Sequence, residues 1–273
     1  MASYFSNWLE RTGDTSLSYS QGGSLGTFGT DQAGRFSLGY MVDPMECYEF
    51  SFLGSLSWNR ELQSTGPVDS TLQSNDPNWL THLQQATSQH QFQSATMRSY
   101  SLHKRLITDE LGNSYFGLGV IDYAEQYSLH SQGPNGTASM NIDTSNLWVG
   151  TQAGMELWRP LSQRLSIGAQ GNGGLYANFA DADWRADSGS GLTLKTSADK
   201  WNLAFLVGVN ARARYRFNSY CAAYGGYEWT YLGGLATVDQ QPIQTLSTTP
   251  SWNMTTNAGF LLQGAQCGLE FQY

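Results

Sequence analysis

The segment from Trp201 to Phe217 alternates two kinds of residue over seventeen positions, far more than the five or six residues of an ordinary strand. One phase is uncharged and aromatic at both ends: Trp201, Leu203, Phe205, Val207, Val209, Ala211, Ala213, Tyr215 and Phe217. The other phase carries Arg212, Arg214 and Arg216. A helix would scatter arginines spaced by two, whereas a strand places them on one face. This pattern is typical of a membrane barrel strand, with apolar residues toward lipid and polar residues toward the lumen.

The same alternation recurs along the chain and predicts the fold class. It is present in Arg35–Val42, Tyr48–Trp58, Asn146–Trp158, Arg164–Phe179 and Leu261–Tyr273. Tyr115–Leu129 also alternates, but its phase changes near Asp122, which predicts a β-bulge there. Nine strands are expected from Gly34 to Tyr273, and Ala2–Leu9 would supply a tenth. We therefore predict an all-β chain, a single domain over residues 1–273, folded as a closed antiparallel transmembrane β-barrel of about ten strands, with eight or twelve as alternatives.

The composition agrees with a lipid-facing barrel. Only 13% of the residues are charged, about half the usual share of a soluble protein, and the mean hydropathy is −0.39. No stretch approaches the roughly 18–20 apolar residues that a membrane helix needs. We therefore expect the chain in a cell outer membrane, in contact with its lipid, although no signal peptide is visible after Met1.

The connections between the predicted strands alternate between short and long, as in outer-membrane barrels. The short ones are Asp43–Glu46, Thr108–Asn113, Arg159–Gln163 and Asn218–Ser219, and we place them on the periplasmic side. The long ones, at 61–92, 130–144, 180–199 and 238–255, are predicted to be outside loops. Within the first of these, residues 76–86 predict a short capped helix, either folded into the mouth or lying on the rim.

Charged side chains in the inward phases are the candidate site. They are Arg35, Glu49, Glu156, Arg164, Arg212, Arg214, Arg216, Glu228 and Glu270. One interpretation is a charged constriction that sets ion selectivity, with the arginines as a path for anions. The other is an interior network of ion pairs that fills a narrow barrel, because an eight-stranded barrel is already filled by side chains and buried charges must be paired.

Aromatic residues near the strand ends are predicted to form the girdles at the membrane interfaces. We assign Trp58, Trp158, Trp201, Tyr215, Phe217, Trp229, Phe271 and Tyr273 to this role. Trp79, Trp184 and Trp252 are expected in loops. The chain ends on an aromatic in the lipid phase of its last strand, a pattern that resembles the signal read by the barrel-assembly machinery.

Other classes of function find little support in the residues. The net charge of −8 and the pI of about 4.9 argue against nucleic acid as a partner. The histidines, His82, His90, His103 and His130, are expected in loops or at strand ends, so no catalytic residue is assigned. The Asp181–Asp187 stretch lacks the glycine and closing glutamate of a calcium loop and is expected to be solvated.

The three cysteines show no metal-binding spacing. We expect Cys47 to point inward, Cys221 and Cys267 to point outward, and all three to be free thiols. No metal and no cofactor are expected.

Several runs resemble the planctomycete-type β-barrel porin-like outer-membrane family. They are AGRFSLGYMVDP (Ala33–Pro44), ECYEFSFLG (Glu46–Gly54), NLWVGTQAGMEL (Asn146–Leu157), GGLYANFA (Gly173–Ala180), AFLVGVNARARYRF (Ala204–Phe217), YGGYEWTYLGGLA (Tyr224–Ala236) and GFLLQGAQCGLEF (Gly259–Phe271). The likeness runs from about Gly34 to the end, with the runs in the expected order. It implies the fold and the location.

Two functions therefore stand open. The first is a porin-like barrel that allows passive passage of small polar or ionic solutes through a narrow charged lumen. The second is a structural or surface-assembly barrel with a closed lumen, whose outside loops bind neighbouring proteins or surface polymers. A homo-oligomer or surface-layer neighbours are possible partners of either.

Overall fold

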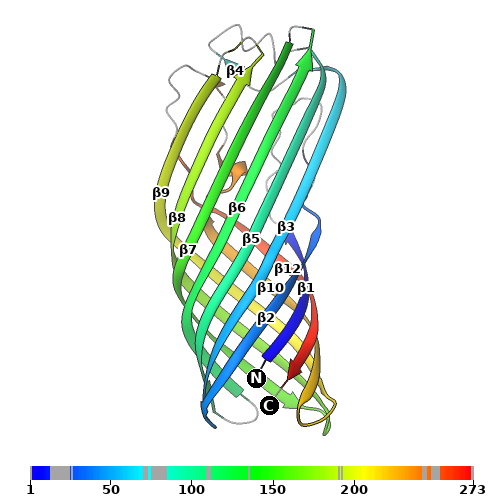
Figure 1. The fold of residues 1–273 in the computed structure, drawn as a ribbon, viewed down its shortest axis with the longest axis vertical. Helices are drawn as coiled ribbons and strands as arrows, with labels where there is room; N and C mark the ends of the chain where they lie inside the picture. The colour runs from blue at the N-terminus through cyan, green and yellow to red at the C-terminus, as the bar shows by residue number, and fades with distance from the viewer. Residues whose placement is uncertain are drawn as a thin grey trace.

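A computed structural model describes residues 2–12, 25, 27–69, 73–74, 85–108, 112–134, 136–189, 191, 193–241, 245–246 and 253–271. Ten antiparallel strands close into one barrel in the order β1-β12-β10-β9-β8-β7-β6-β5-β3-β2 (Figure 1). Their bounds are β1 Ala2–Thr12, β2 Thr30–Asp43, β3 Glu46–Val68, β5 Ala86–Ile107, β6 Gly112–Gly133, β7 Gly136–Pro160, β8 Leu165–Ser188, β9 Thr193–Arg216, β10 Cys221–Leu235 and β12 Ala258–Phe271. The predicted closed barrel of ten strands is confirmed, including the first strand.

Two small elements complete the described chain. β4 (Gln73–Ser74) and β11 (Thr245–Leu246) pair in parallel, and η1 (Val238–Gln240) is a single 3-10 turn. Within these residues, no helix is long and apolar enough to cross a membrane.

One end of the barrel, here called the turn end, carries tight connections and both chain termini (Figure 1). β2 ends at Asp43 and β3 begins at Glu46, with the Met45 backbone N–H donating to Asp43 Oδ1 at 2.7 Å. Asn218 Oδ1 accepts backbone N–H bonds from Tyr220 and Cys221. These side-chain bonds replace the ladder where the chain reverses. The short connections follow the prediction.

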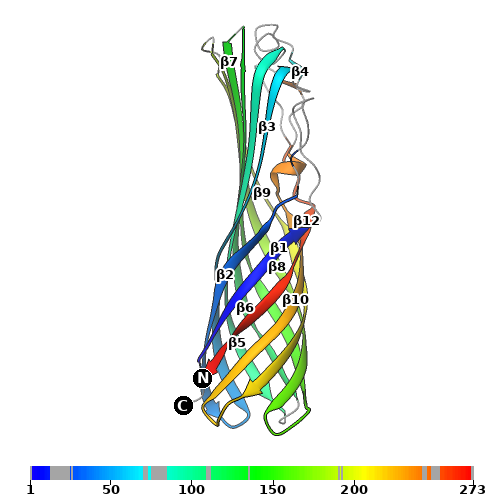
Figure 2. The same cartoon turned by 90° about the vertical axis from the view of Figure 1, so that its right-hand side faces the viewer.

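At the opposite end of the barrel, here called the loop end, the prediction of long loops is wrong. β3 runs on to Val68 and β5 begins at Ala86. β6 ends at Gly133 and β7 begins at Gly136, while β8 ends at Ser188 and β9 begins at Thr193. Most of the ranges 130–144 and 180–199, and both ends of 61–92, are therefore strand. The predicted helix at 76–86 lies almost entirely outside the described residues, and Ala86 itself begins β5. β3 and β5–β9 extend past the other four barrel strands as a curved sheet (Figure 2).

The sequence pattern does not reveal these extensions, because the hydrophobic residues change from the outer to the inner face along the extended strands, as β7 illustrates. In the turn-end part of β7, Leu147 and Val149 are exposed on the outer face, opposite Gln152 and Glu156 on the inner face. In the loop-end part, the inward Met140 is buried, as are the other inward residues there, and polar side chains face out. A polar outward phase does not mean a loop when that part of the strand faces water rather than lipid.

The same inversion explains the predicted bulge at Asp122, which is wrong. β6 pairs with β5 and β7 without a register shift, and its odd-numbered residues face inward throughout. On the outward phase the residues change from Phe116 and Leu118 to Asp122 and Gln126. The change marks the end of the lipid-facing surface, where apolar residues move from the outer to the inner face.

A true register shift lies in β3 instead. The pairing of β3 with β5 shifts between Leu53 and Leu56. Inward residues are odd-numbered before it and even-numbered after it, so Leu53 and Leu56 both face the lumen. Such a shift re-aims every later side chain of the strand.

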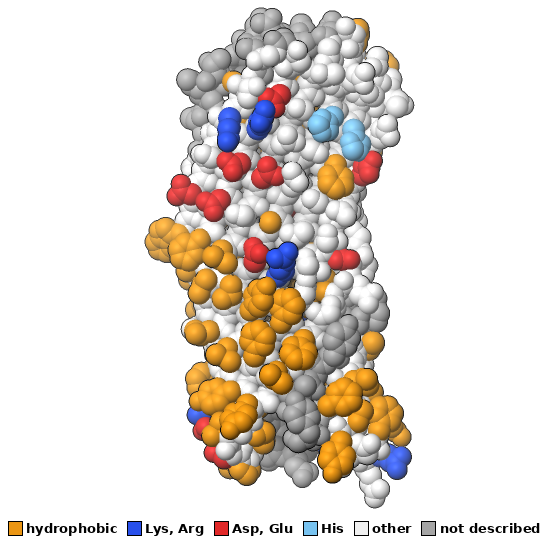
Figure 3. Space-filling model, viewed as in Figure 1, with side chains coloured by type: hydrophobic (Ala, Val, Ile, Leu, Met, Phe, Trp, Pro, Cys, Tyr) orange, Lys and Arg blue, Asp and Glu red, His pale blue; other side chains and the backbone are white. Residues whose placement is uncertain are grey.

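Exposed hydrophobic residues form a band around the turn-end half of the barrel. Figure 3 shows this band on one face, with charged and histidine side chains above it. Trp201 at its upper edge is 74% exposed and Val207 within it is 53% exposed. Soluble monomers do not expose a continuous apolar surface of this extent. It is the surface that a transmembrane β-barrel presents to lipid.

We predict that Val207→Arg destabilises the barrel in a lipid bilayer by about 2–4 kcal/mol, because it places a charge on the lipid face. Ser197→Arg is the matched control, on the same face of β9 but beyond Trp201, and should change stability little. Guanidinium unfolding in phospholipid vesicles measures both. Equal effects of the two substitutions would contradict the assigned band.

Candidate functional site

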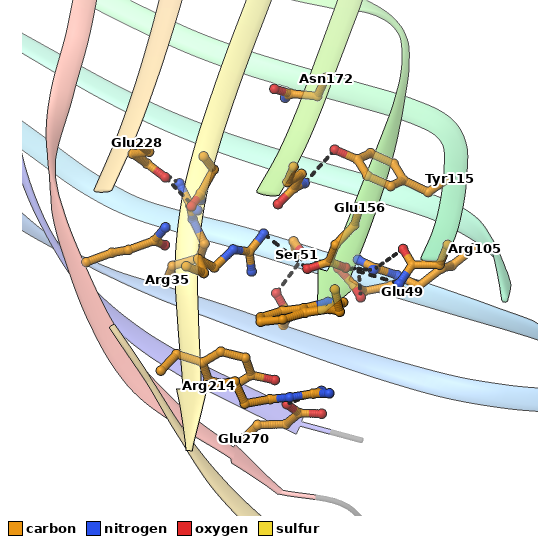
Figure 4. Close-up of a pocket in the computed structure, with 18 of the residues that line it drawn as sticks. Arg35, Glu49, Ser51, Arg105, Tyr115, Glu156, Asn172, Arg214, Glu228 and Glu270 are labelled. Atoms are coloured by element: carbon orange, nitrogen blue, oxygen red, sulfur yellow. Dashed lines mark hydrogen bonds and ion pairs between the residues drawn. The ribbon is translucent and has the colours of Figure 1, made fainter. Parts of the chain in front are cut away.

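The lumen at the turn end holds a cavity of about 710 Å³. Turn residues such as Pro160, Ser162 and Gln163 line it, so its mouth lies at the turn end. All nine charged residues assigned from the sequence line this one cavity: Arg35, Glu49, Glu156, Arg164, Arg212, Arg214, Arg216, Glu228 and Glu270. Arg164 and Arg216 are exposed at its rim. Figure 4 shows how the other charged residues that it labels converge from different strands: Arg35, Glu49, Glu156, Arg214, Glu228 and Glu270.

Each glutamate of the cavity has an arginine partner. Arg35 reaches Glu228 with both terminal nitrogens, at 3.0 and 3.1 Å. Arg214 lies 3.8 Å from Glu270. Arg105 and Arg212 pair with the other two glutamates, so four carboxylates contact four guanidinium groups.

Arg105 contacts two of the glutamates, and it was not among the charged residues predicted from the sequence. Its terminal nitrogens lie 3.0 Å from Glu49 and 2.7 Å from Glu156, and Asn113 Oδ1 accepts a further bond at 2.8 Å. Arg212 approaches the other oxygen of Glu156 at 3.6 Å. The outward phase of β5, with Tyr100, Leu102 and Leu106, was the signal that could have placed Arg105 inside.

Above the charged layer the cavity becomes neutral and then apolar. Amide side chains such as Gln152 and Asn172 line it next, and Figure 4 shows Asn172 across the charged group from Arg214 and Glu270. His103 lies mid-strand on β5 and contacts Gln152, so the expectation of loop or strand-end positions is wrong for this histidine. The deepest lining is aliphatic: Leu9, Leu53, Met97, Ile121, Leu206 and Leu262.

An apolar cluster that includes these aliphatic residues fills the lumen at this depth. It consists of contacting buried side chains from all ten barrel strands, together with Phe28: Leu9, Ala33, Leu53, Leu56, Trp58, Ala95, Met97, Ile121, Tyr123, Trp148, Tyr176, Ala204, Leu206, Leu232, Leu235, Ala258, Phe260 and Leu262. Trp148 and Tyr123 are 0% exposed. Tyr123 on β6 and Phe260 on β12, two strands on opposite sides of the barrel, have their ring centres 5.2 Å apart, so the cluster crosses the lumen. We call it the seal.

Two residues assigned to the aromatic girdles face the lumen instead. Trp58 is 1% exposed in the seal, with its indole N–H donating to the Leu9 carbonyl at 3.1 Å, because the register shift in β3 turns it inward. Trp158 lines the cavity, with the Arg214 guanidinium 4.7 Å from the centre of its indole ring. It shares the even phase of β7 with Glu156, which should have placed it inside.

The other assigned girdle residues that the structure describes are exposed: Trp201, Tyr215, Phe217, Trp229 and Phe271. Tyr273 lies outside the described residues, as do Trp79 and Trp252. Trp184, expected in a loop, is fully buried on the inward face of β8.

On the loop side of the seal, the chain after β10 folds into the barrel. Asn146 and the backbone of Ala236 exchange two hydrogen bonds of 2.8 Å. Asn178 and Asn202 donate to the Gly234 carbonyl at 2.8 and 3.0 Å. These asparagines stand side by side on β7, β8 and β9. They bond the segment 234–236 where its pairing with β9 has ended, at Gly233. Figures 1 and 2 show η1 beside the long strands at this level.

A buried charge network then holds η1. Asp239 lies 3.1 Å from Arg60, and Glu125 Oε2 accepts the Val238 N–H at 2.8 Å. Gln93 donates to both carboxylates, at 3.0 and 3.1 Å, and Arg11 lies 2.8 Å from Glu125. All of these groups lie on the loop side of Asp122, beyond the lipid-facing band.

Burial and the neighbouring Glu125 raise the pKa of Asp239 from 3.8 to about 7, against the opposing effects of Arg60, Gln93 and Arg11. Two carboxyl groups and two guanidinium groups therefore share a dry site, and ionising the second carboxyl is unfavourable there.

The cysteines and the acidic stretch can now be placed. The three cysteines are free, with Cys47 buried, Cys221 partly exposed and Cys267 exposed. Asp181–Asp187 is strand, not loop, with its aspartates on the outward face of β8. Among the residues that the structure describes, no group of three or more His, Cys, Asp or Glu is placed to hold a metal ion.

Comparison with known proteins gives distant structural similarity only. No protein-family model matches the chain, and no curated sequence matches it. The structure is similar to the outer-membrane protease OmpT from Escherichia coli, at 11% identity over 100% of this chain and 93% of that chain, with a TM-score of 0.44. It is similar to the P. putida toluene transporter TodX (9% identity, 100% and 89% covered, TM-score 0.41) and to the translocator domain of the autotransporter NalP from Neisseria meningitidis (9%, 100% and 88%, 0.31).

At these identities and TM-scores the fold assignment depends on the strand register itself. The resemblance to planctomycete-type barrels is not tested by these matches and stays a prediction.

We predict that the folded barrel loses stability as the pH rises from about 4 through about 7, by up to about 4 kcal/mol. The folded state holds a proton on Asp239 over that window, whereas the unfolded chain has released it. Asp239→Asn should flatten this part of the profile, and Asp181→Asn, on the outer face of β8, should leave it unchanged. Guanidinium unfolding at each pH measures the effect. An unaltered profile in Asp239→Asn would contradict the assignment.

Proposed function

We propose that the chain is an outer-membrane β-barrel whose lumen is closed, and that it acts as an anchor for its extension beyond the membrane. The observation that carries this proposal is the seal, to which all ten strands contribute buried side chains. A passive pore needs a continuous wetted path, and the described lumen is interrupted by Trp148, Tyr123 and their neighbours.

The proposed orientation places the turn end in the periplasm and the extension outside the cell. Outer-membrane barrels have short periplasmic turns and longer outer connections. Lipid would contact the exposed band, and β12 would be the strand presented to the barrel-assembly machinery. The cavity would then open to the periplasm.

The extension supplies the surface for contacts. Its outward faces are polar and acidic, with Asp143 on β7 beside Asp183 and with Asp181 beside Asp199 on β8 and β9. The inward faces pack with Val238 of η1 as a second core that includes Met140, Ile142 and Trp184. A rigid, soluble-like layer of this kind suits contact with neighbouring proteins, surface polymers or further copies of the chain.

Porin-like passage of small polar or ionic solutes is the second candidate. One observation favours it: the wetted, charged cavity already occupies the turn-end half of the lumen. Passage would require the side chains of the seal to move and the segment 234–241 to leave the asparagines and charges that hold it.

Planar-bilayer recording of the purified, folded barrel separates the two candidates. We expect no conductance above that of the bare bilayer. As a positive control, replacing Trp148, Tyr123 and Tyr176 together by glycine removes three large side chains of the seal and should produce ion conductance. Heat-modifiable migration on a gel verifies that each variant is folded. Steady conductance of the unmodified barrel would overturn the closed-lumen proposal and favour the pore.

A further inference from the structure

Behind the exposed arginines at its rim, the cavity has four glutamates paired with four arginines, and it has two neutral groups that make no hydrogen bond to the protein. Asn210 on β9 and Gln266 on β12 both line it, and they are 7% and 3% exposed. Asn210 Oδ1 and Gln266 Nε2 are buried and have no hydrogen-bond partner among the protein groups. A buried amide atom left unbonded is costly, so such an atom calls for a partner. One free group is an acceptor and the other is a donor.

The two groups stand close together on the barrel wall. Asn210 pairs with Glu228 on β10, and Glu228 pairs with Gly264, two residues from Gln266 on β12. They are therefore two strands apart, about 10 Å across the sheet. The Arg35–Glu228 ion pair lies between them and has already satisfied its charges.

An apolar surface lies deeper on the same two strands. Leu206 precedes Asn210 by four residues and Leu262 precedes Gln266 by four, so each pair shares the inward face of its strand. Four residues of strand span about 13 Å. From the mouth inward, a molecule would meet the exposed arginines of the rim, then the paired charges, then one free donor and one free acceptor, and then the aliphatic lining.

We infer that the cavity binds an uncharged small molecule that carries an amide group and an apolar moiety. Its carbonyl accepts from Gln266 Nε2, its N–H donates to Asn210 Oδ1, and its apolar part lies against Leu206 and Leu262. Behind the rim, an ion is disfavoured because the four glutamates and the four arginines of the charged layer are already paired with one another. The volume of about 710 Å³ lies within the range of ligand sites. This inference goes beyond the proposed anchor function and does not depend on whether the barrel conducts.

Three matched probes test the charge requirement. N-acetyl-L-phenylalaninamide is uncharged, N-acetyl-L-phenylalanine carries a carboxylate, and L-phenylalaninamide at pH 6 carries an ammonium group. Isothermal titration of the full-length folded barrel in detergent, with empty micelles subtracted, measures their affinities. We expect the uncharged probe to bind at least about tenfold more tightly than either charged one. Equal affinities, or no binding of the uncharged probe, would overturn the inference.

Variants test the two amides. Asn210→Leu and Gln266→Leu should each weaken binding of the uncharged probe by roughly threefold to tenfold, as expected for the loss of one hydrogen bond. Gln132→Leu, exposed on β6 at the loop end, is the matched control and should bind as the original chain does. If water alone satisfies Asn210 and Gln266, neither leucine variant changes the affinity, and the inference fails.

Asn210→Asp keeps the test decisive if a leucine variant does not fold. It has nearly the same shape but adds a carboxylate without an arginine of its own. The preference should shift toward L-phenylalaninamide by at least about tenfold. An unchanged order of the three affinities in Asn210→Asp would show that Asn210 does not face the bound molecule.

Discussion

The whole architecture depends on the need to pair every backbone N–H and C=O within the hydrocarbon layer of a membrane. Lipid offers no partner for these groups, so a sheet can cross only if it closes on itself. β1 meets this need by pairing with β12 along its full length, from Ala2 to Thr12. Closure then fixes the two faces of every strand, because side chains alternate between lipid and lumen. The exposed band and the charged cavity are thus two sides of one constraint.

The interior of a barrel is either packed with side chains or open to water, and this barrel has both kinds of interior at different depths. A ten-stranded barrel is only slightly wider than one that side chains fill completely. Near the turn end the lumen is wide enough for arginine–glutamate pairs, whose charges are tolerable because each is matched. Deeper in, Trp58, Trp148 and Tyr176 supply the volume that smaller side chains would leave empty. The same geometry therefore produces a hydrated cavity below and a dry seal above, without any change in strand number.

The sequence predicted the lipid-facing parts of the strands correctly, but it did not predict the parts of the strands that lie beyond the lipid. The outward phase of β9 from Trp201 to Phe217 could be identified directly, because only lipid favours so long an uncharged face. Beyond the lipid the outer face becomes polar and the inner face becomes apolar. In β6 after Asp122, polar and apolar residues therefore still alternate, but the apolar residues now point inward. In the sequence, that inversion has the same pattern as a bulge, and the polar outward faces of the strand extensions have the same pattern as loops. The real register shift, at Leu53–Leu56, left no mark in composition, and it alone turned Trp58 inward.

The segment 234–241 could not have been placed from its own residues. Its position depends on Asn146, Asn178 and Asn202, which are far apart in sequence and meet only because β7, β8 and β9 are neighbours in register. The same holds for Asp239, which meets Glu125, Arg60 and Arg11 from three different strands. Buried polar contacts between distant strands carry no local signal, yet each is strong in a dry interior because a missing partner is costly. The loop side of the seal is therefore held by groups whose roles become visible only once the barrel has closed.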